Sequence, residues 1–430
     1  MFARLGLLSF GGPAAQIALM HRLLVEERGW LDEKRFLEAL GFCTLLPGPE
    51  AMQLATYAGW RLHGTRGGLV AGLLFVAPGA LLVLLLAALY ATLGETPLVA
   101  TLFFGIKAAV LIVVVQAFVR IASRALLSTR HRLIAACAFV ALFFLSLPYP
   151  LVVLAAALAG WTAAESPAAP GPAAPGPPAP DPLAPGLAVT GPAARSGWGP
   201  LASTARTALT WLAVWWLPVL ALALLPGTDL LLELARFFSM LAVVTFGGAY
   251  AVLAYLAQDV VARFGWLSAE EIMDALALAE TTPGPLILVT EFVGFLAAFG
   301  DGGLVAGLAG AAVTLWVTFV PCFLWIFAGA PWLDRLSAQP RLRGALASIT
   351  AAVVGVMLNL SLWFALHALF GSVERERLGP LTLWTPEWST LDGRLVLLSA
   401  LCAVLTFRHR WGVPALLGFA AVAGALLRAL

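Results

Sequence analysis

Long apolar runs separated by short polar stretches dominate the chain, and the clearest of them cover residues 69–93, 98–119, 304–327 and 346–370. A helix needs about 20 mainly apolar residues to cross a bilayer, and each of these runs reaches that length. A membrane barrel would instead show short segments that alternate apolar and polar residues, and the sequence lacks them. Only helices and closed barrels satisfy their backbone in lipid. The pattern therefore predicts an all-α polytopic membrane protein.

Composition agrees with this class and excludes several others. Apolar residues make up 61% of the chain and charged residues 11%, against about 45–50% and about 25% in soluble domains. The net charge of +2 and the lack of a basic cluster give no reason to expect nucleic acid as a partner. The four cysteines lie in apolar segments without paired spacing, which favours buried free thiols over a metal site or disulfides. No P-loop and no catalytic constellation is visible, so we expect neither an enzyme nor a cofactor.

Several motifs occur twice at a nearly constant offset. The offset is 236 for the glycine pair (247 − 11) and for the PGP triplet (283 − 47), and 235 for a GGLVAGL segment (302 − 67). Two copies of a membrane unit, each with glycine and proline inside apolar runs, indicate a transporter with its site between the repeats. The paired motifs are Phe10-Gly11-Gly12 with Phe246-Gly247-Gly248, Trp30-Leu31 with Trp266-Leu267, Pro47-Gly48-Pro49 with Pro283-Gly284-Pro285, and 67–73 with 302–308.

The repeats suggest four parts. Residues 1–164 form the first repeat, 165–206 a linker rich in Pro, Ala and Gly, 207–226 a linking transmembrane helix, and 227–430 the second repeat. Six apolar segments in each repeat predict about 13 spans, arranged 6 + 1 + 6. Because the linking helix adds one span, the second copy is expected to be inverted relative to the first.

The distribution of Lys and Arg gives an orientation. With the N-terminus in the cytoplasm, the 6 + 1 + 6 arrangement places fifteen of these residues inside and nine outside, which is a modest positive-inside bias. We therefore expect a cytoplasmic N-terminus and an external C-terminus.

The glycine and proline breaks carry the functional argument. Proline removes a backbone donor and clashes with the preceding turn, so a helix cannot run undisturbed through Pro13 or Pro49. Such breaks are tolerated in a bilayer where the backbone is buried in protein or lines a wet cavity. A half-helix beginning there points free N–H groups and a positive dipole end into the membrane interior, where an anion can bind. The alternative is that the breaks are kinks that only shape packing.

Few charges lie in the apolar segments. Lys107 sits within a spanning run, where a lysine costs about 2.5–3.5 kcal/mol and therefore faces a cavity or a partner. It could contact an anion, act in coupling, or snorkel. Gln116 could bond substrate, although bonding between helices is favoured. The acids close to the breaks could carry a proton or stabilise a half-helix N-terminus, and they are Glu50, Glu280 and Glu291.

At these motifs the chain resembles the chromate ion transporter family, over nearly its whole length. The resemblance implies a bacterial or archaeal inner-membrane carrier that expels chromate with the proton-motive force, with sulfate as a chemical look-alike. The open alternatives are a carrier for sulfate or another oxyanion, and proton-coupled import. The residues that carry the resemblance are Ser9-Phe10-Gly11-Gly12-Pro13, Gln16, Trp30-Leu31, Leu46-Pro47-Gly48-Pro49-Glu50, Gln53, Gly59, Phe246-Gly247-Gly248 and Thr282-Pro283-Gly284-Pro285.

The motifs and the breaks together define a predicted substrate site. Its expected ligand is a small inorganic oxyanion, its surroundings are the lipid bilayer, and a homodimer is one arrangement left open. The predicted substrate-binding residues are Ser9, Gly11, Gly12, Pro13, Gln16, Pro47, Gly48, Pro49, Gln53, Lys107, Gln116, Thr245, Gly247, Gly248, Thr282, Pro283, Gly284 and Pro285.

Overall fold

The structure is a computed structural model, and it describes residues 1–9, 12–94, 96–163, 199–246, 253, 255–256, 259–333, 335 and 339–429. Helices make up almost all of the described chain, with one two-stranded sheet among the described residues. The protein is thus an all-α polytopic membrane protein. The first repeat and the linking helix contain α1 (Phe2–Leu8), α2 (Gly12–His21), the π-helix η1 (Arg22–Glu27), α3 (Glu33–Leu45), α4 (Glu50–Leu93), α5 (Pro97–Ala125), α6 (Thr129–Phe143), α7 (Tyr149–Ala163) and α8 (Gly199–Leu222).

The described elements of the second repeat follow an order similar to that of the first, with a β-hairpin inserted between its last long helix and its final pair. It contains α9 (Asp229–Val244), the π-helix η2 (Val260–Phe264), α11 (Ala269–Thr281), η3 (Leu286–Leu288), α12 (Val289–Gly329), η4 (Ala330–Trp332), α14 (Pro340–Leu369), β1 (Val373–Leu378), β2 (Leu381–Pro386), η5 (Trp388–Thr390), α15 (Gly393–Phe407) and α16 (Val413–Ala429).

Side-chain caps start the helices that lead into the PGP breaks. The carboxylate of Asp32 accepts a hydrogen bond from the Arg35 amide at 2.7 Å and begins α3. Ser268 and Glu271 form a reciprocal capping box at the start of α11. A capping side chain satisfies an amide that has no acceptor within the helix. Both repeats therefore fix the start of the helix that ends at the break.

The long helices α4 and α12 each contain a sharp turn. Gly64 has φ +64° and Gly303 has φ +68°, which glycine adopts without strain. The two arms on either side of each turn pack closely against each other. A Cβ added at Gly59 would lie 2.5 Å from the Cβ of Ala71. Each of these long helices is therefore two antiparallel helices joined by a glycine turn.

The broken helices return to the end of the bundle from which they start. The rings of Phe2 and Trp30 lie 6.2 Å apart, so the start of α1 is close to the chain that follows η1. One cavity of about 660 Å³ is lined by both Asp229 and Arg263, which flank the second copy of this pair. Another cavity is lined by Ser268 at the start of α11 and Gly300 near the turn of α12.

This geometry differs from the expected six full spans in each repeat. Five described helices are long and apolar enough to cross a membrane, and they are 50–93, 101–125, 201–222, 286–332 and 340–369. Shorter apolar helices cover 149–163, 393–407 and 413–428. The runs near residues 2–20, 36–60 and 272–299 are among the twelve segments expected to cross, but their breaks let them fold back. Part of the run near 237–257 lies outside the described residues. An apolar run alone cannot distinguish a span from a re-entrant pair.

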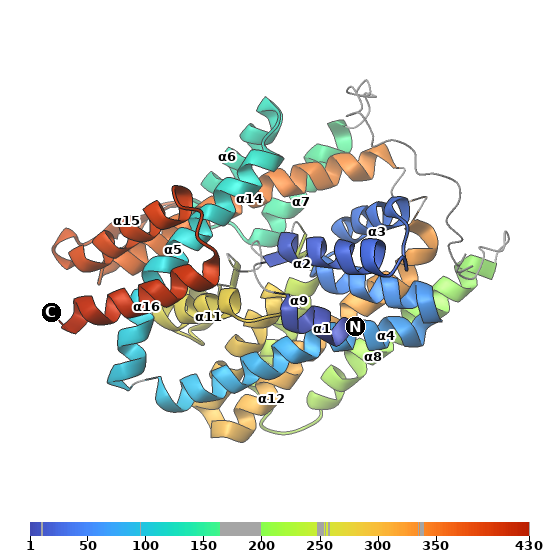
Figure 1. The fold of residues 1–430 in the computed structure, drawn as a ribbon, viewed down its shortest axis with the longest axis horizontal. Coiled ribbons are helices and arrows are strands. Elements are labelled where there is room, and N and C mark those ends of the chain that lie inside the picture. The colour runs from blue at the N-terminus through green and yellow to red at the C-terminus, as the bar shows by residue number, and fades with distance from the viewer. Residues whose placement is uncertain are drawn as a thin grey trace.

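The two repeats exchange their packing partners. Helix α5 packs against α15 and α16 of the second repeat, whereas α14 packs against α6 and α7 of the first (Figure 1). Small residues permit these close approaches, as is usual between membrane helices. Gly105 in α5 lies against the backbone of Ala420, and Gly160 in α7 against that of Gly344. The fold is thus a single interlocked body rather than two separate halves.

Helix α8 links the repeats. It begins at Gly199, whereas residue 207 was the expected start of the linking helix. It packs against α12, where the Trp316 indole donates to the Trp215 carbonyl at 3.3 Å. Residues 164–198, which cover most of the predicted linker, lie outside the described part of the chain.

Candidate functional site where the broken helices cross

The break of each repeat is hydrogen-bonded to the break of the other. The Gly48 amide donates to the Thr245 carbonyl at 2.9 Å, and the Gly284 amide donates to the Ser9 carbonyl at 3.0 Å. The two bonds are related by the repeat offset of 236 (284 − 48 and 245 − 9). We call these four residues the crossover. Both glycines have positive φ, +116° at Gly48 and +101° at Gly284.

Two buried amide side chains brace the crossover from the first repeat. The Gln16 side chain donates to the Gly284 carbonyl at 2.7 Å and to the Ser9 carbonyl at 3.3 Å. The Gln53 side chain donates to the Pro47 carbonyl at 2.7 Å. Gln16 is 2% exposed and Gln53 is fully buried. These bonds satisfy carbonyls that the breaks free from helical pairing.

The hydroxyl groups near the breaks bond within their own helices. Ser9 Oγ donates to the Leu5 carbonyl, Thr245 Oγ1 to the Leu241 carbonyl, and Thr282 Oγ1 to the Ala279 carbonyl. Each hydroxyl retains acceptor capacity and can turn toward another partner. All three residues are buried. The crossover is therefore a polar centre enclosed by apolar helices.

Helix α4 starts at the crossover without a side-chain cap. Its N-cap is Pro49, and no side-chain hydrogen bond caps this end. Helix geometry leaves the first amides, including those of Ala51 and Met52, without an acceptor inside the helix. Both residues are buried. Buried donors at a helix N-terminus favour a negatively charged partner.

Close backbone approach requires glycine at the crossover. A Cβ at Gly48 would lie 2.9 Å from both Cys322 Sγ and Gln53 Nε2. A Cβ at Gly284 would lie 3.3 Å from the Cα of Gly79. The positive φ adds strain for any other residue. The PGP glycines are therefore needed both for their conformation and for the space around them.

Three carboxyl groups lie near this centre. Glu50 is half-buried in the first turn of α4, while Glu280 is 5% exposed and Glu291 is 1% exposed. Within the described residues, neither carboxyl oxygen of Glu291 has a hydrogen-bond partner. A charged carboxylate costs far more in such surroundings than the neutral acid. Glu291 is thus the most deeply buried of the three acids.

Lys107 does not join the crossover. It lines a cavity of about 560 Å³ together with Tyr90, Glu270, Asp274 and Arg428. Its Nζ lies 3.2 Å from Glu270 Oε1, and the Tyr90 hydroxyl donates to Asp274 Oδ2 at 2.8 Å. Glu270 precedes the second break by twelve residues (282 − 270), about 18 Å of helix.

The lysine therefore has an ion-pair partner, although the sequence around it shows no carboxylate at helical spacing. The partner comes from the other repeat, so no local pattern could reveal it. Gln116 lies nine residues further along α5 and is half-buried. Among the described residues, neither side chain forms a hydrogen bond or an ion pair with the crossover. Gly11, Gly247 and Gly248 lie outside the described residues, as does the side chain of Pro13.

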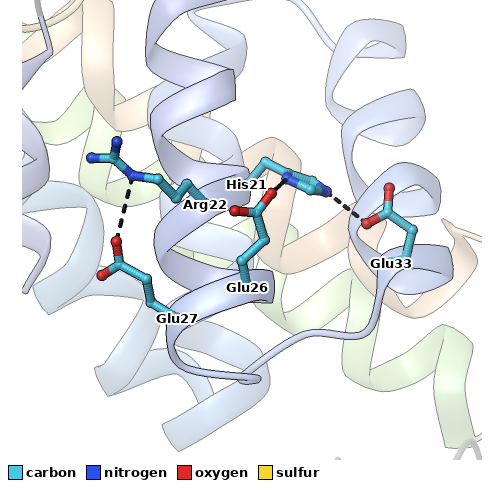
Figure 2. A network of polar contacts seen from close by, with 5 residues as sticks. All are labelled: His21, Arg22, Glu26, Glu27 and Glu33. Carbon is cyan, nitrogen blue, oxygen red and sulfur yellow. Dashed lines mark hydrogen bonds and ion pairs between the residues drawn. The ribbon is translucent and has the colours of Figure 1, made fainter.

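A polar network connects the two broken pairs of the first repeat. The His21 ring lies between two carboxylates, with Nδ1 3.1 Å from Glu26 Oε1 and Nε2 2.6 Å from Glu33 Oε2 (Figure 2). The hydrogen bond that the His21 ring donates to the Glu33 carboxylate is the main reason that the pKa of His21 is raised above 6.5. Arg22 and Glu27 pair beside it at 3.4 Å. This network links the end of α2 to the start of α3.

Comparison with known proteins identifies the family. The model of a family described as chromate transporter matches residues 1–161 and 232–425. A chromate transport protein of Pseudomonas aeruginosa is 33% identical over 83% of this chain and 77% of its own length. A probable chromate transport protein of Synechococcus elongatus is 30% identical over 83% of this chain and 81% of its own length.

A third relative, a chromate transport protein of Cupriavidus metallidurans, is 29% identical over 83% of this chain and 79% of its own length. No solved structure matches the chain. The two segments matched by the family model include the crossover residues Ser9, Gly48, Thr245 and Gly284. The chain belongs to the chromate transporter family.

Proposed function

We propose that the protein is a secondary carrier that exports chromate across the inner membrane, uses the proton-motive force, and gives chromate resistance. The observation that carries this proposal is the crossover, in which Gly48 and Gly284 bond across the repeats. Inverted repeats with interrupted helices place anion sites at half-helix N-termini near the bilayer midplane. Buried amide donors at such a point fit a divalent oxyanion, which presents acceptors only.

The crossover bonds also suggest how the site opens. In the described conformation the amides of Gly48 and Gly284 are used by carbonyls of the opposite repeat. Movement of one repeat relative to the other would release both donors together, beside the amides of Ala51 and Met52. Exchange of a carbonyl for an anion at these donors would then couple binding to the movement of the repeats.

The membrane potential favours export. An inside-negative potential drives a dianion outward by about 2 × 2.3 kcal/mol per 100 mV, so no ATP is needed. Carriage of sulfate or another oxyanion would use the same donors. Proton-coupled import would need an acid that carries protons, for which Glu50, Glu280 and Glu291 are the candidates.

The re-entrant pairs change which Lys and Arg residues lie on each side of the membrane, and this strengthens the argument for one orientation. If the broken helices return to their own side, nine helices cross: the second arms of α4 and α12, together with α5, α6, α7, α8, α14, α15 and α16. Seventeen described Lys and Arg residues then lie at the N-terminal side and six at the other. This is a stronger bias than fifteen against nine, and by the positive-inside rule it supports a cytoplasmic N-terminus.

The two sets are as follows. The cytoplasmic set is Arg4, Arg22, Arg28, Lys34, Arg35, Arg61, Arg66, Arg120, Arg124, Arg130, Arg132, Arg206, Arg335, Arg341, Arg343, Arg408 and Arg410; the external set is Arg236, Arg263, Arg375, Arg377, Arg394 and Arg428. Reporter fusions after Pro170 and at Leu430 should report opposite faces. Single cysteines at Gly29 and Gly64 should both react from the cytoplasm, and external labelling of either would refute the re-entrant pairs.

Transport in inverted membrane vesicles tests the function directly. Vesicles that contain the protein should take up radiolabelled chromate, and an uncoupler should abolish this uptake. Empty vesicles give the baseline, and excess sulfate tests the alternative substrate. If the vesicles take up sulfate but no chromate, sulfate is the substrate and the proposal of chromate is wrong. If uptake persists with the uncoupler, the proton-motive force does not drive transport.

A further inference from the structure

A β-hairpin is inserted into the second repeat only. Helices α14 and α15 are joined by residues 370–392, which contain β1 and β2, whereas α5 and α6 are joined by residues 126–128. The hairpin does not extend freely into solvent. The Thr382 amide donates to the Phe144 carbonyl at 2.6 Å, and Thr382 is 3% exposed. The insertion is therefore docked on the turn between α6 and α7 of the first repeat.

The strand pattern separates the charges of β1 onto two faces. The sequence of β1 is VERERL, and successive side chains of a strand point to opposite faces. Arg375 and Arg377 therefore share one face, and Glu374 and Glu376 share the other. Across the sheet, Arg375 pairs with Trp384 and Arg377 with Thr382. The arginine face is thus the face that docks on the first repeat.

The arginine face closes a basic cavity. A space of about 500 Å³ is lined by both hairpin arginines, by Arg263 and Asp259 at the π-helix η2, and by Ser146, Leu147, Pro148, Tyr149 and Tyr255. Neither hairpin glutamate is among its lining residues. Three guanidinium groups against one carboxylate leave two net positive charges. We call this space the arginine cavity.

The contacts within the arginine cavity position the guanidinium groups without neutralising them. Arg375 donates to Ser146 Oγ at 3.1 Å and lies over the Trp384 ring at 5.4 Å. Burial, followed by the neighbouring charge of Arg377, lowers the pKa of Arg375. Asp259 is paired with Arg263 at 3.4 Å. Among the described residues, no ion pair joins either hairpin arginine to a carboxylate.

We propose that the arginine cavity is a second oxyanion site, which binds a divalent inorganic oxyanion at the external mouth of the carrier. This inference rests on the proposed function, because it assigns the cavity to the same class of substrate. Arginine forks match the oxygens of such anions and bind them through charge-assisted hydrogen bonds. A basic cleft also raises the local concentration of anions at low ionic strength. The site lies on the external face in the orientation proposed above, with Arg263 and Arg428 on that same face.

The hairpin supplies its own matched control. The double variant Arg375→Gln/Arg377→Gln removes two charges from the cavity face, and Glu374→Gln/Glu376→Gln removes two charges from the opposite face of the same strand. Binding of radiolabelled sulfate and chromate to the full-length protein, purified in uncharged detergent, should weaken by at least about tenfold in the arginine variant, as expected for one or two lost charge-assisted bonds. The glutamate variant should bind as the unmodified protein does. Equal binding by all three proteins would overturn the proposal.

Vesicles of both orientations separate this site from the crossover. The arginine variant should show a raised half-saturation for chromate offered at the external face, and an unchanged value at the cytoplasmic face. The difference should shrink as ionic strength rises, because salt screens exposed charges. An equal loss at both faces would overturn the assignment to an external site. If the unmodified protein transports no chromate from either face, the proposed function fails, whereas oxyanion binding to the purified protein still tests the arginine cavity.

A lipid phosphate could offer the same oxygens and charge. Binding to neutral phosphatidylcholine vesicles that contain 20–30% anionic phospholipid, roughly a natural fraction, is compared for the arginine and glutamate variants at equal protein. We expect both variants to associate with anionic lipid to the same extent. Loss of lipid association in the arginine variant, with sulfate binding retained, would assign the cavity to lipid headgroups and overturn the proposal.

Discussion

The two copies of the helical hairpin that follows the PGP break differ in how sequence maps onto structure. In the first copy the helix begins at Glu50 and turns at His63, and in the second it begins at Val289 and turns at Gly302. Both arms therefore have the same length, since 63 − 50 and 302 − 289 are both 13. The structural offset here is 239, three more than the offset of 236 at the break itself.

Three extra residues account for this shift. In the second copy a short 3-10 turn, Leu286–Leu288, separates the break from the helix, whereas in the first copy the helix follows Pro49 directly. The GGLVAGL segments, offset by 235, consequently serve different purposes. In the second copy, Gly302 and Gly303 of this segment form the turn. In the first copy, the equivalent Gly67 lies within a helix and faces Gly59. Identical sequence thus marks common ancestry more reliably than a common structural position.

Because of the same shift, different side chains occupy equivalent structural positions in the two copies. With the structural offset, Glu291 of the second copy corresponds to Met52 of the first, and both are buried. Gln53 corresponds to Phe292, so the amide that braces Pro47 has no counterpart. The crossover is therefore symmetric in its backbone bonds and asymmetric in its side chains. We interpret the backbone as the substrate-binding element and the asymmetric acid as the candidate for coupling.

The largest loss of transport is expected from variants that disrupt the backbone hydrogen bonds of the crossover, which are the symmetric part of the site. Gly48→Leu and Gly284→Leu force a side chain into a space where a Cβ already meets Cys322 or Leu288 within about 3 Å, at positive φ. Each should reduce chromate uptake by at least about 100-fold, the size of loss that misplaced binding groups cause. Uptake in inverted vesicles, normalised to protein level, is the measurement.

The control for these variants must be a glycine with open surroundings and an ordinary backbone. Gly303 is unsuitable because its φ is +68°. Gly418 in α16 meets no atom within 4 Å of an added Cβ, and Gly418→Leu should transport normally. If Gly48→Leu reaches the membrane and transports as Gly418→Leu does, the breaks act only as kinks.

Lys107 should rank next, because it lies in a cavity rather than at the crossover. Lys107→Ala removes the cation and should lower uptake by about ten- to a hundredfold if it contacts the anion. Glu270, its partner, is 77% exposed, and an exposed ion pair contributes little to stability. Glu270→Gln should therefore transport nearly normally. Equal losses in both variants would instead assign Lys107 to a structural ion pair.

The sequence predicts the breaks well and their partners poorly. Proline and glycine act locally, so α3 ends at Leu45 and α4 begins at Glu50, as the PGP triplet indicates. The bond between Gly48 and Thr245, and the pair between Lys107 and Glu270, join residues that are far apart in sequence and depend on how the repeats pack. The fold-back of the broken helix pairs also could not be predicted locally, because the length of an apolar run by itself predicts a full membrane span. The charge separation on β1 was visible in VERERL, but only once that segment was known to be a strand.

Glu291 tests whether the asymmetric acid couples transport to protons. Glu291→Gln keeps the size of the side chain and fixes it in a neutral form, so folding and membrane level should be retained. If Glu291 carries the proton, chromate uptake in this variant should lose its response to an imposed pH gradient while the response to membrane potential remains. Glu280→Gln and Glu50→Gln, measured alongside, identify which acid is involved. A response to the pH gradient equal to that of the unmodified protein would exclude Glu291 from coupling.

The smallest effect should come from the His21 network, which joins the end of α2 to the start of α3 at the surface of the first repeat. The pKa of His21 is raised above its unfolded value of about 6.5, chiefly by Glu33 and then by Glu26. Its stabilising effect is therefore complete below pH about 6.5 and is lost as pH rises through the higher folded pKa. Between pH 6 and pH 8.5, the Tm of the unmodified protein should fall by about 1–2 °C more than that of His21→Gln, a small shift because the network is solvent-exposed. Parallel Tm curves for the two proteins would show that the network contributes no pH-dependent link between the two broken pairs.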